Sequence, residues 1–332
     1  MMDQGDLFDP NYQDWNCGIA DLKELRFATA REKLHKYGES TGDWATVEVY
    51  GDIAGFLQTG LGEIDNEAPE APEAYWELWE KLALRAAGMK IPDPSLLNDL
   101  RRNYFRKAVG VVERLGMTEH PRLPGNLPLG LLYGEAGDWD RAIASLQACL
   151  PTAANNADLY AYLGDAYLRR GEREVARRCY LEACLVDPGG IDWERLMDRE
   201  LISLRVYMEE SGREKKGEEG SDLRVPALAW LPARAYVAGI FKPKIIRLKD
   251  EFKTFVDDFQ ALEKRFLKEK DHALGAALFF RGIIICDNER ALRLVKGMDF
   301  ADIRARMREI NPPLFADYLR VIKERKKKQK PG

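Results

Sequence analysis

The sequence contains few side chains with the types and spacing that chemistry requires. Its three histidines, His35, His120 and His272, have no metal-ligand spacing to another histidine, a cysteine or a carboxylate. The sequence also lacks a phosphate-binding glycine loop, a G-x-S-x-G nucleophile turn and an H-E-x-x-H zinc motif. We therefore expect no catalytic residue, no metal site and no cofactor, and we predict that the protein is not an enzyme.

The cysteines are the other candidate reactive groups. There are five, and no two of them form a C-x-x-C pair. An odd number without motif spacing is typical of buried free thiols in a reducing compartment. Cys179 and Cys184 flank Tyr180 on a predicted packing helix, which favours buried thiols over nucleophiles. Because the acidic N-terminus also lacks the apolar core of a secretory signal, we expect a cytoplasmic protein.

Charge is distributed unevenly along the chain. Residues 1–80 carry 18 acidic and 5 basic side chains, whereas residues 211–332 carry 18 acidic and 28 basic ones. One interpretation is ordinary variation among solvated surfaces. The other is that the acidic and basic ends associate, either within one chain or head-to-tail between two copies.

Two further segments bear on membranes and nucleic acids. The most apolar stretch, 272–286, contains Arg281 and is too short and too charged to span a bilayer. The basic tail 323–330 lacks the interleaved aromatic residues that stack on bases. We expect this tail to be a solubilising helix end, whose cations complement the helix dipole, and not a nucleic-acid site.

Helical periodicity dominates the elements that must position any site. Apolar residues recur every three to four positions, and no segment alternates for long enough to predict a strand. We therefore predict an all-α fold. The predicted helical segments are 19–37, 44–61, 73–88, 94–115, 244–270, 271–286, 288–297, 300–310 and 313–326.

Prolines and charged glycine-rich stretches predict the boundaries of five segments. Pro69 and Pro72 interrupt helical periodicity, and residues 209–222 combine three glycines with charged residues and nothing apolar. The predicted parts are an acidic N-terminal helical segment (1–62), a linker with helices (63–122), a repeat region (123–208), a flexible linker (209–222) and a basic C-terminal helical domain (223–332).

The repeat region shows self-similarity at an offset of 34 residues. Leu163, Gly164, Tyr167, Gly171 and Ala176 match residues of the same type 34 positions earlier, namely Leu129, Gly130, Tyr133, Gly137 and Ala142. The first glycine of each copy would let two helices approach closely. The second would supply a turn with positive φ. The spacing therefore predicts two helix–turn–helix units.

This pattern resembles the tetratricopeptide repeat, a helical pair of 34 residues. The clear copy spans 157–190 and matches the signature at Tyr160, Leu163, Gly164, Tyr167, Gly171, Ala176, Tyr180, Ala183 and Pro188. The weaker copy spans 123–156, with Asn126 where a large apolar residue is usual and Ala154 where proline is usual. The resemblance implies stacked repeats flanked by additional helices. Residues 191–208 fit either a third, degenerate pair or a capping helix.

The resemblance also implies a binding face, because the first helix of each such pair lines a groove for a partner peptide or helix. It assigns this role to Leu127, Leu131, Glu135, Asp158, Ala161, Tyr162, Asp165, Leu168 and Arg169. Only Arg169 among them is cationic, so we do not expect the carboxylate clamp of co-chaperone members. An amphipathic helix or a mixed polar–apolar segment would suit this surface better. The alternative is that these residues simply pack on neighbouring helices.

Two functional hypotheses follow. The first is a protein–protein interaction scaffold or adaptor that binds a partner peptide or helix in the groove of the repeats. The second is an assembly or oligomerisation component of a larger complex that works through residues 223–332, with the repeats as a positioning arm. Both rest on analogy of fold and not on a chemical site.

Overall fold

The structure is a computed structural model that describes residues 10–214, 224–292 and 299–328. Within these ranges every regular element is helical, apart from one isolated antiparallel bridge between Arg122 and Pro128. The predicted all-α class is confirmed. The chain divides into two compact units, Met1–Thr152 and Ala153–Gly332. This division falls inside the predicted repeat region, so each unit holds one of the two predicted repeat helix pairs.

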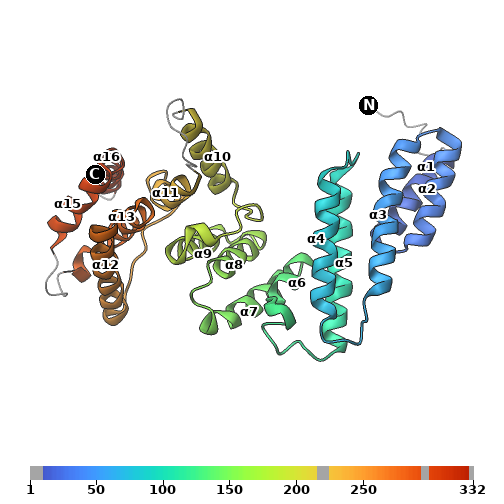
Figure 1. Ribbon diagram of the computed structural model, residues 1–332, viewed down its shortest axis with the longest axis horizontal. Coiled ribbons are helices and arrows are strands. Elements are labelled where there is room, and N and C mark those ends of the chain that lie inside the picture. The colour runs from blue at the N-terminus through green and yellow to red at the C-terminus, as the bar shows by residue number, and fades with distance from the viewer. Residues whose placement is uncertain (1–9, 215–223, 293–298, 329–332) are drawn as a thin grey trace. The chain divides into compact units, whose positions relative to one another are not determined.

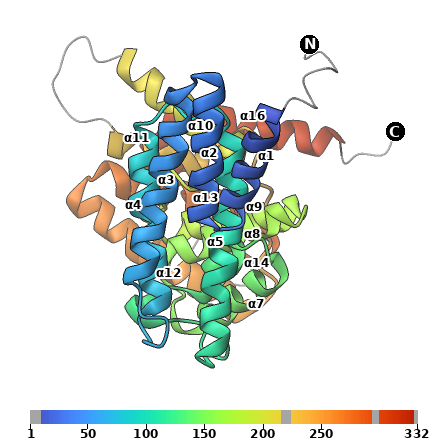
Figure 2. The ribbon, with the colours of Figure 1, turned by 90° about the vertical axis from the view of Figure 1, so that its right-hand side faces the viewer.

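Unit one is a succession of helices in which each packs against the next along the chain. Helices α1 to α5 lie with their axes roughly aligned in both views, and α1 also contacts α5 (Figure 1, Figure 2). The predicted helices at 44–61, 73–88 and 94–115 correspond to α3, α4 and α5 within two residues. The helices are α1 (Pro10–Lys23), α2 (Phe27–Thr41), α3 (Trp44–Glu63), α4 (Ala71–Ala87), α5 (Pro94–Arg114), η2 (Pro124–Asn126), α6 (Leu129–Glu135), α7 (Trp139–Cys149) and η3 (Leu150–Thr152).

The periodic stretch 19–37 forms two helices, and the expectation of one continuous helix is wrong. Leu25 lies between α1 and α2 with a φ of 61°, and the buried Asp21 holds this turn. Its carboxylate accepts hydrogen bonds from Lys33 Nζ at 2.7 Å and Arg26 Nε at 2.9 Å. These bonds, that from Lys33 foremost, lower the pKa of Asp21 to about 2. Apolar periodicity cannot reveal the break because a charged cluster causes it.

Unit two contains the second predicted repeat pair and the C-terminal helices. The predicted helices at 271–286, 300–310 and 313–326 are present within two residues of their expected bounds. Its helices are α8 (Ala157–Arg169), α9 (Arg173–Val186), η4 (Pro188–Gly190), α10 (Arg199–Glu214), α11 (Arg224–Val237), α12 (Lys249–Glu269), α13 (His272–Asp287), α14 (Glu289–Leu292), α15 (Phe300–Ile310) and α16 (Pro312–Lys328).

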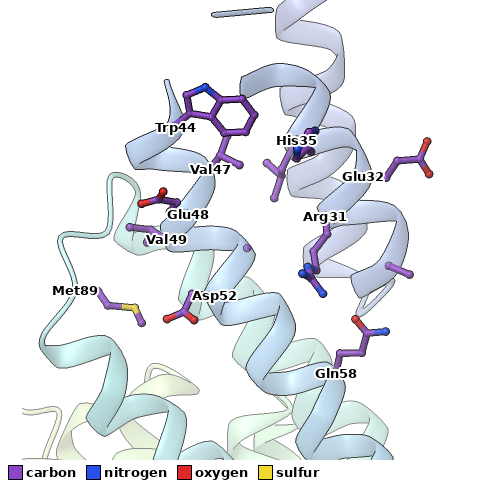
Figure 3. A pocket seen from close by; sticks show the side chains of 13 residues that line it. Arg31, Glu32, His35, Trp44, Val47, Glu48, Val49, Asp52, Gln58 and Met89 are labelled. Carbon is purple, nitrogen blue, oxygen red and sulfur yellow. The ribbon is translucent and has the colours of Figure 1, made fainter. Parts of the chain in front are cut away.

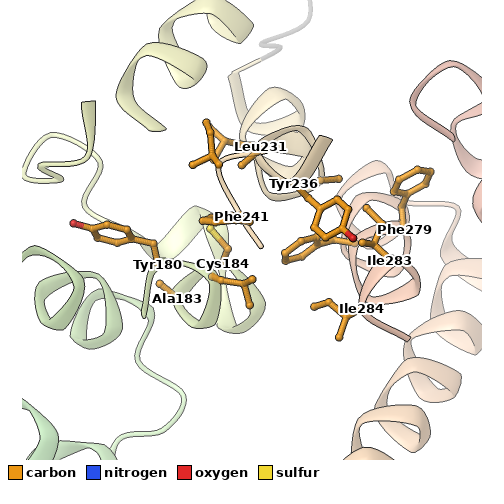
Figure 4. Close-up of a cluster of buried hydrophobic side chains, with 14 of the residues drawn as sticks. Tyr180, Ala183, Cys184, Leu231, Tyr236, Phe241, Phe279, Ile283 and Ile284 are labelled. Atoms are coloured by element: carbon orange, nitrogen blue, oxygen red, sulfur yellow. The ribbon is translucent and has the colours of Figure 1, made fainter. Parts of the chain in front are cut away.

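One apolar core joins the α8–α9 pair to the C-terminal helices of the same unit. Figure 4 shows Cys184 of α9, Tyr236 of α11 and Phe279 of α13 around Phe241. Burying a large apolar side chain contributes roughly 1.5–3 kcal/mol. Much of the stability of α8–α9 therefore depends on helices that follow it in the chain. α11, which the periodicity did not single out, belongs to this core and contains Pro232 within the helix.

Three predicted segments of unit two differ from the expectation in their bounds or their conformation. α10 continues to Glu214, so residues 209–214 of the predicted flexible linker 209–222 are helical instead. The rest of that linker lies outside the described residues. Of the predicted helix 288–297, residues 289–292 form α14 and the rest lies outside the described residues. Residues 191–198 are not helical, so they do not begin a third helix pair.

The predicted helix 244–270 begins only at Lys249, as α12. Residues 244–246 are instead held in an irregular conformation by the buried side chain of Asn288. Its Oδ1 accepts from the Ile246 N–H at 2.8 Å, and its Nδ2 donates to the Lys244 carbonyl at 2.7 Å. As a result Ile245 and Leu248, expected on the apolar stripe, are 60% and 69% exposed.

Candidate functional site

The turns of the two predicted repeat pairs, α6–α7 and α8–α9, have equivalent backbone hydrogen bonds. The Gly137 N–H donates to the Gly134 carbonyl and the Gly171 N–H to the Leu168 carbonyl, both at 3.0 Å. These four residues are related by the 34-residue offset. The two turn glycines have φ values of 84° and 87°, a conformation that only glycine adopts without strain.

The first glycine of each pair lies where the two helices of that pair come closest. A Cβ on Gly164 would lie 2.4 Å from the ring of Tyr180, and a Cβ on Gly130 would lie 2.5 Å from Leu146 Cγ. Real side chains do not approach so closely, so a larger residue would push the helices apart. The predicted close approach of the two helices is present in both pairs.

Asp165 lies on the predicted binding face of α8, but the residue is only 7% exposed. Its Oδ1 accepts from the Tyr180 hydroxyl at 2.6 Å and from the Met197 N–H at 2.9 Å. Burial raises the pKa of Asp165 to about 7, although these two hydrogen bonds favour the charged form. Asp165 therefore connects α8, α9 and the segment 191–198.

Asp158, two turns earlier on α8, contacts the same segment. Its Oδ1 accepts from the Asp192 N–H at 2.7 Å, and burial raises its pKa. Within the same segment, Ile191, Trp193 and Leu196 are buried in the core of the unit. The segment 191–198 therefore covers this part of the α8 face.

The remaining predicted residues of α8 are more accessible. Arg169 is exposed, although its Nε donates to the Met197 sulfur at 3.0 Å. Tyr162 is half-buried, and burial raises its pKa to about 12. Leu168 is partly buried against the core, whereas Ala161 is fully part of it.

The predicted residues of the weaker copy belong to unit one. Leu127 is buried at 9% exposure, and Leu131 is half-buried. Glu135 forms an ion pair with Arg101 of α5 at 2.5 Å. The structure thus gives Leu127 and Glu135 neighbours within their own unit, as it does for Asp158 and Asp165.

An open hollow of about 990 Å³ lies over α2 and α3 in unit one. Trp44, 40% exposed, stands at the start of α3 and contacts His35 of α2 edge-on with ring centroids 5.1 Å apart (Figure 3). Two acidic residues of the hollow form ion pairs, Glu32 with Lys36 and Asp52 with Arg85. Its charge is therefore largely balanced.

A second hollow, of about 530 Å³, lies in unit two, and we call it the basic hollow. Four cationic side chains line it, against the acidic Asp287 and Glu289. Its volume is in the range of ordinary ligand sites. The lining residues are Pro243, Ile245, Ile246, Cys286, Asp287, Asn288, Glu289, Arg290, Ala291, Phe300, Arg304, Tyr318, Ile322, Arg325 and Lys326.

Three side chains form a partly buried polar link beside this hollow. The Tyr236 hydroxyl donates to both carboxylate oxygens of Asp287, at 2.6 and 2.8 Å, and accepts from Arg325 Nη1. Burial raises the pKa of Asp287 to about 6. Sequence reasoning missed this site, since its members come from four separate segments. The only available signal was the positive charge of residues 211–332.

Other reactive groups do not gather into a site in the part of the chain that is described. All five cysteines are free thiols, and four of them are buried while Cys17 is half-buried. No three His, Cys, Asp or Glu side chains among the described residues could share a metal ion. None of the described helices combines the length and apolarity needed to cross a bilayer.

Comparison with known proteins gives no relative from which a function could be transferred. No protein-family model, no curated protein and no solved structure matches the chain. Functional inference therefore rests on the geometry described above.

Proposed function

We propose that the chain is a non-enzymatic assembly component, which joins a larger complex through the C-terminal helices of unit two. In this proposal the tetratricopeptide-like pair α8–α9 supports those helices. One observation carries it: a single buried core runs from Ala157 and Tyr180 through Tyr236 and Phe279 to Tyr318. The α8 face, meanwhile, is engaged by residues 191–198 of the same chain.

Displacing segment 191–198 to admit a partner peptide would be costly. Trp193 and Leu196 are 7% and 5% exposed, and each would lose roughly 1.5–3 kcal/mol of burial on release. Two carboxylates of α8 would also lose their backbone donors. A partner that competes for this face must supply more than that free energy.

The basic hollow has none of these obstacles. It is open, and Ile245, which lines it, is an apolar side chain that is 60% exposed. Cationic and apolar groups side by side are common at protein interfaces, where arginine is enriched. The hollow is therefore the surface that we assign to assembly.

The second candidate function remains partner capture in the repeat groove. The exposure of Arg169 and the partial exposure of Tyr162 and Leu168 favour it. Truncation after Met208 would separate the two functions poorly, because it removes most of the core on which α8–α9 depends. Surface substitutions are the better test.

The test compares two charge-reversal variants of the tagged full chain in its native cells. We expect Arg290→Glu with Lys326→Glu to lose copurifying proteins or self-assembly, measured by quantitative mass spectrometry and sedimentation velocity. Arg169→Glu with Tyr162→Ala should retain them. The opposite pattern would return the function to the repeat groove. A wild-type chain that stays monomeric and enriches no protein over a tag-only control would refute both.

A further inference from the structure

The basic hollow has an excess of positive charge, and two of its arginines stack on aromatic rings. Arg304 stacks over the ring of Phe300 at 4.0 Å, and Arg325 stacks over the ring of Tyr236 at 4.5 Å. Such contacts restrict the guanidinium groups, so less freedom is lost when they bind a carboxylate. The Nε of Arg304 is buried and has no hydrogen-bond partner among the described residues. The hollow therefore presents restrained cationic groups that suit the binding of acidic side chains.

Apolar groups border the same cavity in a fixed conformation. The Asn288 side chain bonds to Ile246 and Lys244 and also donates to the Ile284 carbonyl at 2.8 Å. The segment that carries the exposed Ile245 is therefore attached to the end of α13. A binding segment would need apolar side chains next to its acidic ones to satisfy both parts of this surface.

The N-terminal residues of the chain have that chemistry. Residues 1–9 read MMDQGDLFD, with three aspartates, no lysine or arginine, and Leu7 and Phe8 next to each other. These residues lie outside the described part of the structure. Nine residues can extend over roughly 30 Å, which is ample for a cavity of this volume.

We propose that the basic hollow binds residues 1–9 of a second copy of the chain. The aspartates face Arg290, Arg304 and Lys326, and Leu7 and Phe8 cover Ile245. Because each copy has one acidic segment and one hollow, the contact is head-to-tail and can add further copies. This inference rests on the proposed assembly function, for which it names the partner and the contact.

A synthetic peptide tests the contact directly. A fluorescent peptide of residues 1–12 is titrated with a chain that lacks residues 1–9, and anisotropy is recorded. We expect saturable binding that weakens at least about fivefold between 50 and 300 mM NaCl, because exposed charges are screened. Replacing the three aspartates by asparagine, or Phe8 by alanine, should each weaken binding at least about tenfold. Absence of binding, or equal binding of the asparagine peptide, would overturn the proposal.

Protein variants locate the binding site. Arg290→Gln and Ile245→Ser change exposed side chains of the hollow and should leave the fold intact while weakening peptide binding. Arg308→Gln is the matched control, because Arg308 is exposed on α15 but does not line the hollow. If Arg308→Gln weakened binding as much as Arg290→Gln, the peptide would be responding to general charge and the proposed site would be wrong.

Sedimentation velocity of the full chain distinguishes this inference from the assembly function. We expect concentration-dependent oligomers that disappear when residues 1–9 are removed. Oligomers that persist without residues 1–9, or that need a different acidic protein, would refute the inference and leave the assembly function standing. A monomeric full chain with a peptide-binding hollow would place the contact within one copy and refute the second-copy assignment.

Discussion

The helix pairs α6–α7 and α8–α9 have equivalent backbone turns, but they differ in the side chains at the positions that contact neighbouring segments. Both have the same turn hydrogen bonds and the same close helix contact at a glycine. At the position where α8 has Asp165, α6 has Leu131, and where α9 has Tyr180, α7 has Leu146. Only the second pair can therefore form the buried Asp165–Tyr180 hydrogen bond and receive the Met197 N–H. The residue types that the two copies share specify the helix pair, and the positions at which the copies differ specify what each pair contacts.

The largest effect is expected from Gly164→Leu. The new side chain would collide with the Tyr180 ring and separate α8 from α9, at a cost of about 3 kcal/mol or more, at the upper end of typical overpacking effects. Urea unfolding of unit two, followed by hydrogen–deuterium exchange, measures the loss. Unchanged protection of α8 and α9 would contradict the close approach on which the comparison of the two pairs rests.

Asp165→Leu, which copies Leu131 of the first pair, tests the polar difference. We expect a loss of about 2–3 kcal/mol, because the Tyr180 hydroxyl and the Met197 N–H lose their shared acceptor in a buried site. Adding Tyr180→Phe should recover about 1 kcal/mol, because it removes one unpaired donor. A double-mutant cycle on the unfolding free energy checks this, and strict additivity would contradict the proposed coupling.

The unfolding free energies of the two units should change with pH in opposite directions. The pKa of Asp165 is about 7 when folded, above its ordinary value of 3.8, so the folded state holds a proton that the unfolded state releases. The unfolding free energy of unit two should therefore fall as pH rises from about 4 to 7, and Asp287 adds the same trend up to about 6. Asp21 of unit one has its pKa lowered to about 2, so its stabilisation is present above pH 4 and lost as pH falls towards 2.

Asparagine variants measure these contributions one at a time. Asp165→Asn should flatten the trend of unit two between pH 5 and 7.5, since asparagine cannot titrate. Asp21→Asn should reduce the acid sensitivity of unit one and leave unit two unchanged. Hydrogen–deuterium exchange, corrected for its intrinsic pH dependence, reports each unit separately. A pH response of unit two that is the same in wild type and Asp165→Asn would show that this carboxylate is not its source.

The smallest effect is expected from Gly51→Ala, which is the matched contrast to Gly164. Gly51 also lies within a helix, but a Cβ there meets no atom within 4 Å. Alanine should therefore stabilise α3 by about 0.5–1 kcal/mol through helix propensity alone. A loss of stability, measured by urea unfolding of unit one, would mean that glycine is needed at this half-buried position for another reason.

Agreement between sequence and structure is closest where the determinants are local. Prolines mark the starts of α4 and α5, and apolar residues at a spacing of three to four specify α3, so their predicted bounds hold within two residues. The failures arise where a distant or charged group decides. Lys33 and Arg26 on Asp21 break the helix predicted at 19–37, and Asn288 delays the start of α12.

The candidate site shows the same division. The resemblance placed Asp158 and Asp165 on an open groove, since position within a repeat is all that a single helix reveals. The structure instead gives both carboxylates backbone donors from segment 191–198, which has no counterpart in the repeat pattern. The basic hollow escaped prediction because its cations come from three separate segments, at Arg290, Arg304 and 325–326, which meet only in the folded unit.

By itself, the sequence determined the helical class, the two glycine-dependent helix pairs and the separation of acidic from basic ends, because each depends on residue type at short spacing. Only the tertiary structure decided which faces stay open. That outcome depends on which distant segment buries its apolar residues against a given helix, and on which buried polar groups find partners there. Such contacts form between positions that no local pattern connects.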